Sequence, residues 1–503
     1  MELVFESSPC AYLRRIVHET RTQEQTADVI VPDSCPDVER IVYASASAIV
    51  RSKECRAGSV VVSGGLRSSA LYVPEGEQMP RVLDAYIPFS IRVDHPALTE
   101  QSQIVLTCGV AGAEARMLNS RKVLLRVNVC CTVDGFEPAE LTTYTLRQQP
   151  PQLRVRCQEY PMLLPAATGE KSFAMSEELT LPSGSTMEQL CCYEAIPLVE
   201  ERRIVADKAV FKGVLAVKVL YLDTTQTLRV LTQQLPFSQY CELAQSFDDD
   251  DAEVQVCMAV TGAQLEPDST QDAQRLMLSM QLLAQCVVRT VQTVTACEDA
   301  YAIGAALEAQ WQTDVLEPQL DAQTARQPLR GQLDADAQSV VDSTVYLGAP
   351  EQTRVDGGVQ VRVPASVNVL YYDRAGALQG ARGRVQAEDT VALAQQGRCV
   401  VQAAVEDSGY TAADGGGLEV RYACQLSVQT YAEQTLRTLC GGTLTPEEQR
   451  PCDRASVIVR RCSARCALWD AAKKYGADAE AIRSANHLTG DELPEGQIVL
   501  IPL

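Results

Sequence analysis

The stretch AVFKGVLAVKVLYLD, residues 209–223, decides how this chain folds. Its apolar residues recur at every second position, whereas Lys212 and Lys218 fall in the opposite phase. A period of two predicts a half-buried β-strand and not a helix, because successive side chains of a strand point to opposite faces. We expect one face of this strand to enter a core, and its residues are Phe211, Leu215, Val217, Val219 and Tyr221.

The same segment occurs twice more, about 150 residues away on either side, which is the size of an ordinary domain. The copies are VVVSGGLRSSALYV, which ends at Val73, and VQVRVPASVNVLYY, which ends at Tyr372. Each copy contains a Leu-Tyr pair and runs into a turn. A Pro-Phe-Ser triplet follows in the first two copies, at 88–90 and 236–238, and is missing after the third. The repeat predicts three related β domains, each a sandwich or a partly closed barrel.

Each predicted domain also closes with an alternating strand, within 122–131, 278–286 and 418–428. Pro364 interrupts the third marker strand, which predicts an edge strand or a bulge. A linker rich in Gln and Pro runs from 147 to 165, and a second linker runs from 440 to 456. The expected domains are 1–147, 166–298 and 325–439, followed by a different fourth piece at 456–503.

The composition limits the possible partners. A formal charge of -21 argues against nucleic acid and anionic membrane surfaces, because both require a basic footprint. The N-terminus MELVFESSPC shows no secretory signal. No stretch approaches the roughly 20 apolar residues of a membrane helix. The sequence therefore predicts a cytoplasmic protein without a membrane span.

The 19 cysteines are an odd number with irregular spacing, which is poor material for a disulfide framework. We expect them to be reduced, small hydrophobic residues. The neighbours Cys130-Cys131 and Cys191-Cys192 should point to opposite faces of a strand and so cannot easily share a metal. Cys462 and Cys466 are a more plausible metal or redox pair, although their spacing differs from the Cys-x-x-Cys of zinc ribbons.

No catalytic constellation is visible. The motifs of serine hydrolases, zinc peptidases and phosphate-binding loops are missing, and the three histidines, His18, His95 and His487, fall in separate segments. The run Asp248–Asp251 lacks the spaced ligands and the glycine of a calcium loop, so a solvated loop is expected. We predict no catalytic residue, no metal and no cofactor.

The hydrophobic period changes after residue 456. A short strand at 456–460 precedes a helix at 467–475, for which Gly476 is the natural stop. Asp478 can cap a second helix at 479–486, and a strand at 497–501 closes the module. Trp469 lies on the apolar phase of the first helix, so it is expected in the module core rather than as a sugar platform.

This module resembles a LysM domain. The resemblance rests on LWDAAKKYG at 468–476, then Ile482, Asn486 and Leu488, and on the closing Leu493-Pro494, Gly496-Gln497 and Ile501-Pro502. LysM domains bind N-acetylglucosamine chains through the loop before the first helix and the loop after the second. The usual Gly-Asp-Thr/Ser-Leu of the first loop is replaced here by residues 463–467. The candidate binding residues are Ser463, Ala464, Arg465, Cys466, Ala467, His487, Leu488, Thr489, Gly490 and Asp491.

The arrangement of three β domains before one LysM is similar to that of SipL-type proteins of spore-forming bacteria, which carry repeated SPOCS domains. The resemblance rests on Val31-Pro32-Asp33, on Pro36–Ile41, and on the Leu-Tyr and Pro-Phe-Ser strands. It implies a non-enzymatic scaffold made in the mother cell, which tethers the basal layer of the spore coat to the forespore surface. The implied protein partner is a coat ATPase, with the LysM contributing to that contact.

Two other readings remain open. The first is a peptidoglycan-binding protein whose LysM holds N-acetylglucosamine oligomers. The second is a cell-wall enzyme, which would need a cleft with a nucleophile or paired carboxylates. Exposed strand edges in the β domains are a further possible contact, through addition of a partner's strand.

Overall fold

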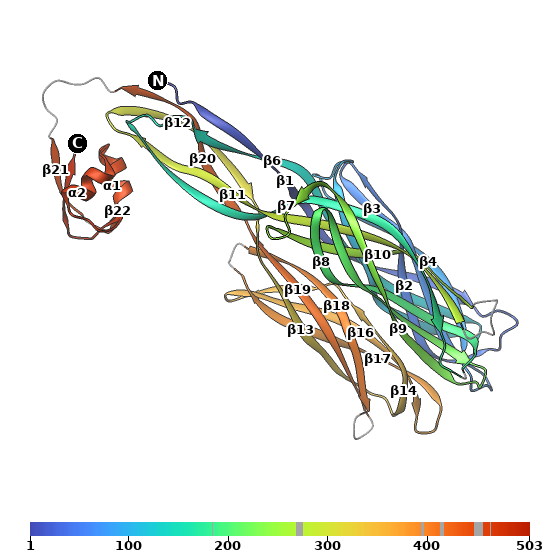
Figure 1. The fold of residues 1–503 in the computed structure, drawn as a ribbon. Coiled ribbons are helices and arrows are strands. Elements are labelled where there is room, and N and C mark those ends of the chain that lie inside the picture. Colours follow the sequence, from blue (N-terminus) through green and yellow to red (C-terminus); the bar gives the residue numbers. More distant parts are fainter. Residues whose placement is uncertain (184, 268–274, 394–396, 413–416, 447–455, 463) are drawn as a thin grey trace.

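The chain folds as three β-sandwiches, a long β stalk and a small C-terminal module (Figure 1). The structure is a computed structural model that describes residues 1–503 except 184, 268–274, 394–396, 413–416, 447–455 and 463. The predicted class, mainly β with three repeated domains and one small mixed module, is confirmed.

The first sandwich sets the pattern of all three. One sheet has the order β1-β6-β5 and the other β2-β3-β4, and all neighbours are antiparallel. The alternation predicted for 122–131 is confirmed, because Val123, Leu125, Val127, Val129 and Cys131 are fully buried between the sheets. The six strands are β1 (Phe5–Ile30), β2 (Val38–Arg56), β3 (Ser59–Pro74), β4 (Arg81–Asp94), β5 (Gln103–Asn119) and β6 (Lys122–Leu146).

The second sandwich repeats this order. Its β8 covers the residues equivalent to both β2 and β3, and β8 pairs with β9 opposite the sheet β10-β11-β7. The opening stretch is confirmed as its core strand, since Phe211, Leu215, Val217, Val219 and Tyr221 are all buried. The strands are β7 (Leu153–Thr180), β8 (Met187–Asp223), β9 (Leu228–Phe247), β10 (Ala252–Pro267) and β11 (Arg275–Ala302).

The third sandwich packs β13-β19-β18 against the sheet formed by β14, β15, β16 and β17. Its first sheet meets that of the second sandwich at one edge, where Gln319 pairs with Leu163. The strands are β13 (Gln319–Leu333), β14 (Ala337–Leu347), β15 (Glu351–Val355), β16 (Gly358–Asp373), β17 (Leu378–Ala392), β18 (Gly397–Ala412) and β19 (Leu418–Ala432).

The Leu-Tyr pairs explain why the marker strand is repeated. Because neighbouring side chains on a strand point to opposite faces, each tyrosine enters the core of its own sandwich while each leucine faces outward. The three outward leucines, Leu71, Leu220 and Leu370, join one shared cluster. The three repeats therefore pack around a common centre.

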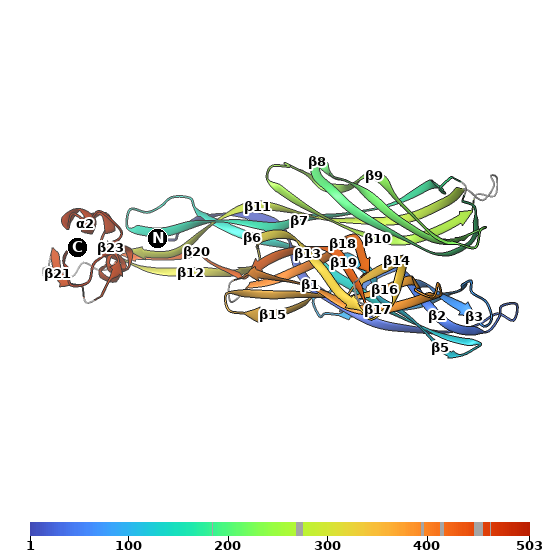
Figure 2. The ribbon, with the colours of Figure 1, turned by 90° about the horizontal axis from the view of Figure 1, so that it is seen from below.

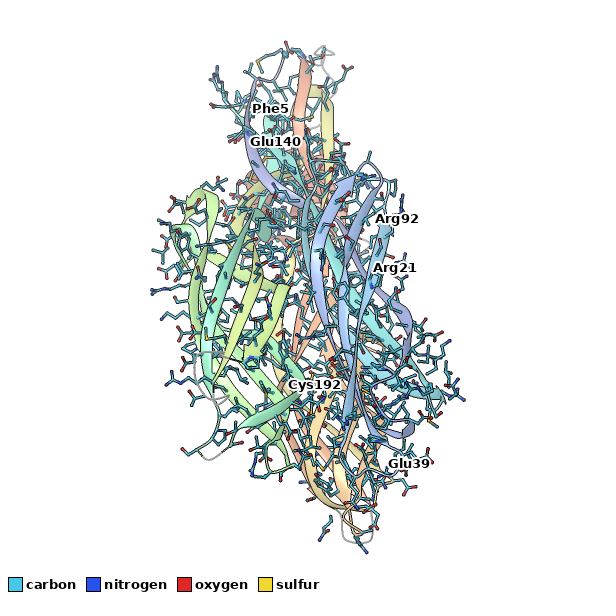
Figure 3. All side chains as sticks on the ribbon, turned by 90° about the vertical axis from the view of Figure 1, so that its right-hand side faces the viewer. Phe5, Arg21, Glu39, Arg92, Glu140 and Cys192 are labelled. Carbon is cyan, nitrogen blue, oxygen red and sulfur yellow. A yellow bond between two sulfur atoms is a disulfide. The ribbon has the colours of Figure 1, made fainter. Side chains whose placement is uncertain are left out.

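A polar junction lies beside this leucine cluster. The Lys218 ammonium donates to Ser343 O at 2.8 Å and to Thr344 Oγ1 at 2.9 Å, and it lies 3.2 Å from the Asp342 carboxylate. Tyr43 Oη of the first repeat donates to Asp342 Oδ2 at 2.8 Å. Figure 3 labels Cys192 in this region, between strands of different repeats. Around Lys218, the outward face of the marker strand thus meets another repeat rather than water.

The sequence predicted that the strand containing Pro364 is an edge strand or has a bulge. This prediction is wrong, because the irregularity lies in the neighbouring strand. Strand β16 has partners on both sides, and Pro364 pairs with Gln386 of β17. On the other side the neighbouring strand is broken between β14 and β15, and Gly348 N–H donates to Pro364 O at 2.7 Å. Proline has no N–H to donate, so the neighbour accommodates it by leaving the ladder at that point.

The stalk consists of three two-stranded ribbons, one from each repeat. They are the ends of β1 and β6, the ends of β7 and β11, and the pair β12 (Ala305–Leu316) and β20 (Gln434–Pro446). Their apolar side chains form two clusters along the stalk. The stretch 147–165, expected as a linker, lies largely in β7. The domain limits given above therefore remain a proposal.

The C-terminal module lies at the end of the stalk, away from the sandwiches (Figure 2). Its predicted elements are confirmed: Gly476 ends the first helix in the left-handed conformation, at φ 60°, and Asp478 accepts a hydrogen bond from Glu480 N at 2.8 Å. The elements are β21 (Val457–Arg461), β22 (Cys466–Ala467), α1 (Leu468–Tyr475), α2 (Ala479–Ala485), β23 (Glu492–Leu493) and β24 (Ile498–Pro502). In the described part of the chain, no helix has both the length and the apolar character that crossing a bilayer requires.

The expectation that all cysteines are reduced is wrong for one pair. Cys157 of β7 and Cys297 of β11 face each other in the stalk and form a disulfide. Adjacent antiparallel strands hold these two residues side by side, a proximity that an irregular spacing in sequence does not reveal. The other 16 described cysteines are not disulfide-bonded. Cys452 lies outside the described residues.

Candidate binding surface

The fold brings together the two loops that the sequence predicts as a binding surface. Cys466 pairs with Leu493 and Ala467 with Glu492 in the short ladder β22–β23, and Leu468 N–H donates to Asp491 O at 2.8 Å. The first loop therefore lies directly beside the second. Ser463 lies outside the described residues. Of the remaining candidates, Ala464, Arg465, His487, Thr489, Gly490 and Asp491 are exposed, and Cys466, Ala467 and Leu488 are half-buried.

Charged side chains connect and brace these loops. Arg465, whose side chain is 73% exposed, forms an ion pair with Glu492 of β23, directly after the second loop. Arg483 of α2 pairs with Asp491 and donates to Gly490 O at 3.3 Å, and the Asp491 hydrogen bond raises the pKa of Arg483. Glu492 and Arg483 are not among the residues predicted from the sequence. Arg483 lies one helical turn before the predicted second loop, a spacing that could have suggested this brace.

His487 opens the second loop in a left-handed conformation, with φ 53°. Its backbone N–H donates to Ser484 O at 3.3 Å, and its exposed imidazole lies outside the helix. The αL region is uncommon for residues other than glycine and marks the sharp change of direction after α2. The imidazole is thereby available to a ligand at the loop.

The opposite side of the module is held by the stalk. Trp469 Nε1 donates to Asp299 Oδ2 at 2.8 Å, and the Trp469 ring meets Tyr301 edge to face, with 4.9 Å between ring centroids. Trp469 also packs against the module's own core, as predicted, but it is only half-buried there, and its polar edge serves the contact with the stalk. Trp469 is thus in contact with the stalk and the module core and does not form part of the two loops.

Three further contacts fix the module in place. Lys473 Nζ donates to Asp299 Oδ1 at 2.5 Å, Tyr301 Oη donates to Ala477 O at 3.0 Å, and Arg154 forms an ion pair with Asp478. Burial raises the pKa of Asp299, but the hydrogen bonds from Lys473 and Trp469 outweigh it, so the net pKa is lowered and the carboxylate stays charged. These contacts come from α1 and the turn after it, which leaves the two loops exposed.

The remaining cysteine and histidine candidates have structural settings. Cys462 and Cys466 are free, half-buried thiols, and burial together with the neighbouring Cys466 raises the pKa of Cys462. His18 Nδ1 lies 2.8 Å from Asp134 Oδ1, within the first sandwich. Across the described ranges, no three His, Cys, Asp or Glu side chains gather in a way that could hold a metal ion.

A hollow, which the sequence did not suggest, lies on the second sandwich beside the Pro-Phe-Ser triplet. It has a volume of about 390 Å³ and is lined by Glu200, Glu201, Lys212, Gly213, Val214 and residues 236–238. Charges of both signs border it, and Lys212 lies 3.5 Å from Glu201. The sandwiches therefore offer a separate surface to a partner.

Comparison with known proteins addresses both regions. Residues 186–261 match the model of the SipL SPOCS domain, and residues 468–502 match the LysM domain. A search of curated proteins found no match, and a search of solved structures also found none.

The two matches confirm the resemblance deduced from the sequence, on the second β repeat and on the C-terminal module. Both are non-catalytic binding domains, and together they support a sporulation-related coat protein with a module of the peptidoglycan-binding type. The chain combines a SPOCS domain of the SipL type with a C-terminal LysM domain.

Proposed function

We propose that this protein is a non-enzymatic scaffold of spore coat assembly that acts in the mother cell. It tethers the basal layer of the coat to the forespore surface through contact with a coat morphogenetic ATPase, and the LysM loops form part of that contact. The observation that carries this proposal is the fixed presentation of the LysM: the stalk holds α1, while the two loops are exposed.

The shape of the molecule supports attachment at two ends. The three sandwiches lie at one end of the stalk and the LysM at the other (Figure 2). A chain that contacts its partners at both ends gains effective concentration for the second contact, so weak individual modules can give firm attachment. A scaffold requires this arrangement, whereas an enzyme requires a reactive cleft.

The Arg465–Glu492 ion pair favours a protein partner at the loops. Its cation, Arg465, lies in the first loop, where the usual LysM sequence is Gly-Asp-Thr/Ser-Leu, and its anion, Glu492, lies in the adjacent β23; both side chains are exposed. Exposed charge pairs of this kind contribute little to stability, but they can select a partner of complementary charge and steer its approach. We therefore assign Arg465 a role in partner recognition.

The proposal can be tested with the full chain and one charge-reversed variant. We expect the wild-type chain to capture a coat ATPase from sporulating cells and Arg465→Glu to lose about ten-fold in affinity for the purified ATPase, because like charges replace a complementary pair. Arg362→Glu is the matched control, since Arg362 also forms an exposed cross-strand ion pair, with Glu388 of β17. Equal binding by all three chains would contradict the proposed role of the loops.

The alternative function is peptidoglycan binding, which the LysM match favours. Calorimetric titration of the full chain with N-acetylglucosamine oligomers separates the two functions. Saccharide binding without capture of an ATPase would replace the scaffold proposal by a wall-binding protein. Capture without saccharide binding would assign the altered loop to protein contact. If the chain binds neither, the hollow beside the Pro-Phe-Ser triplet becomes the next surface to test.

A further inference from the structure

The part of the stalk that holds the LysM lies immediately beyond the disulfide. Cys157 pairs with Cys297, and the next pairs toward the stalk end include Arg156 with Asp299 and Arg154 with Tyr301. These four residues, here called the docking platform, face the module, and Ile303 beside them packs against its core. Arg154 pairs with Asp478, Asp299 accepts from Trp469 and Lys473, Tyr301 donates to Ala477, and the Arg156 guanidinium lies 5.6 Å from the Trp469 ring centroid.

A β-bulge separates the disulfide from the docking platform. The register between β11 and β7 shifts between Cys297 and Asp299, so that Glu298 is the extra residue, and Tyr160 Oη donates to its carboxylate. A bulge changes the direction in which the following side chains point. Here it aims Asp299 at α1, and the disulfide fixes the strands on the side of the bulge away from the module.

The disulfide can be reached from solvent. Cys157 is exposed, whereas Cys297 is half-buried and its backbone N–H donates to Thr438 Oγ1 of β20 at 3.1 Å. Thiol–disulfide exchange requires a thiolate to approach one sulfur, and Cys157, as the exposed member of the pair, is the one that a thiolate can approach. Among the described residues, every cysteine outside the disulfide is buried or half-buried.

We propose that Cys157 and Cys297 form a thiol–disulfide exchange site that controls the docking of the LysM on the stalk. The co-reactant is a dithiol, either a small molecule or a dithiol reductase. Its thiolate attacks Cys157 Sγ, breaks the bond between the sulfurs and releases Cys297 as a thiolate that takes up a proton. The second thiol of the co-reactant then resolves the mixed disulfide, so the dithiol is oxidised to a disulfide and both cysteines become thiols.

The physical effect of reduction is loss of the covalent constraint nearest the docking platform. Residues 153–156 and 299–302 then depend on ladder hydrogen bonds and on the apolar packing of Leu153 and Ala300, at a strand end, where paired strands fray most readily. Fraying moves Arg154 and Arg156 relative to Asp299 and Tyr301, and the contacts to Trp469 and Asp478 are lost together. The LysM then becomes free of the stalk and exposes the Trp469 face of α1. This inference concerns the module's attachment and does not depend on which partner the loops bind.

Trp469 provides a direct measure, because the chain has only two tryptophans. In the full-length Trp311→Phe chain, fluorescence reports on Trp469 alone. We expect acrylamide quenching of Trp469 to rise about two-fold when a dithiol reductant is added, since opening of the strand end uncovers the indole. The Asp299→Ala variant should show the high value with and without the reductant, and the Cys157→Ser/Cys297→Ser variant should match the reduced chain in both conditions.

Three results would overturn the proposal. One is unchanged quenching on reduction while Asp299→Ala raises it, which would show docking without the disulfide. Another is a response to the reductant in the Cys157→Ser/Cys297→Ser chain, which would assign the effect to other thiols. The third is alkylation of both cysteines in the unreduced wild-type protein, which would show that no disulfide forms. If a variant does not fold, hydrogen exchange of residues 468–478 in the wild-type chain tests the proposal instead. The proposal expects faster exchange when the reductant is added, and unchanged exchange would overturn it.

Discussion

The second and third sandwiches fill the same position of their core in two different ways. In the second, Gly213 of β8 lies directly opposite Phe237 of β9, and in the third, Val363 of β16 lies opposite Ala387 of β17. All four positions are buried. The pair of a very small and a large residue is thus replaced by two of intermediate size, which conserves the filled volume. The missing Pro-Phe-Ser triplet is therefore a repacking of the same fold.

The strand segment beside Gly213 explains why the two sandwiches differ at this core position. In the second sandwich that segment is the first half of β8, which contains Leu198. A Cβ added at Gly213 would lie 2.0 Å from the backbone oxygen of Leu198 and 2.9 Å from the Phe237 ring. In the third sandwich the corresponding neighbour is interrupted between β14 and β15, beside Pro364. The break that accommodates proline also gives Val363 its space. Two differences that look separate in the sequence thus belong to one change in packing.

The largest expected effect concerns the common centre around which the three repeats pack. Equivalent positions of the three marker strands hold Ser69, Lys218 and Asn368 there. Lys218→Met should lower the free energy of unfolding by about 3–4 kcal/mol, because Asp342, with a 4% exposed side chain, loses its cation. Denaturant unfolding of the full chain measures this loss. Lys212→Met is the control, since Lys212 is exposed, and we expect little change there. A loss no larger than in the control would show that the centre does not need the charge pair.

The comparison of the two cores predicts the next effect. Gly213→Val should destabilise the chain by about 2–3 kcal/mol, because the new side chain meets both a backbone carbonyl and a packed ring. Adding Phe237→Ala should recover only part of the loss, since the Leu198 carbonyl stays in place. Denaturant unfolding of both variants tests this point. Complete recovery in the double variant would mean that the broken neighbouring strand is not needed.

Local patterns predicted much of this fold. The period of two identified the core strands, and the Leu-Tyr repeat identified three equivalent units. Alternation shows that Leu220 and Tyr221 face opposite ways, but it cannot show what lies beyond the outward face. The meeting of Leu71, Leu220 and Leu370 depends on how whole sandwiches pack. Long-range pairing also explains why 153–165 extends β7 instead of serving as a linker.

The candidate site shows the same division. Both loops and both helix ends of the LysM follow from caps and stops close in sequence. The stalk contact could not be predicted, because Asp299 and Tyr301 lie some 170 positions before their partners in α1 and in the turn after it. The disulfide was missed for the same reason, since Cys157 and Cys297 are 140 residues apart.

A smaller effect separates the two helices of the LysM. Helix α1 has no side-chain cap, whereas Asp478 caps α2 and also pairs with Arg154 of the stalk. Asp478→Ala should cost about 1 kcal/mol of local stability through loss of the cap, and hydrogen exchange of residues 479–485 measures it. Asp470→Ala, in the first turn of α1, is the control. If both variants exchange alike, the cap is not what stabilises α2.

The smallest effect concerns the turns that follow the marker strands. Asp223 and Asp373 occupy equivalent positions, where the first repeat has Pro74. Asp223 Oδ1 accepts from Thr225 Oγ1 at 2.6 Å and from Thr227 N at 2.9 Å. The Thr225 hydroxyl and then Arg229 hold the pKa of Asp223 well below its ordinary value, and Gln379 and the backbone of Ala377 lower the pKa of Asp373.

A carboxyl group whose pKa is lowered by folding stabilises the fold above its unfolded pKa, about 3.9, and loses that contribution as the pH falls through the lowered value. Hydrogen exchange in the turns at 223–227 and 373–377 should therefore accelerate below about pH 4, whereas the turn at 74–76, which has no such aspartate, should lack this acid-dependent step. Asp223→Asn should flatten the acid response of its own turn and leave that of 373–377 unchanged. Equal acid sensitivity of all three turns would mean that a general acid transition, and not these carboxylates, controls them. The proline turn would then be equivalent to the aspartate turns, and the repeats would differ in packing alone.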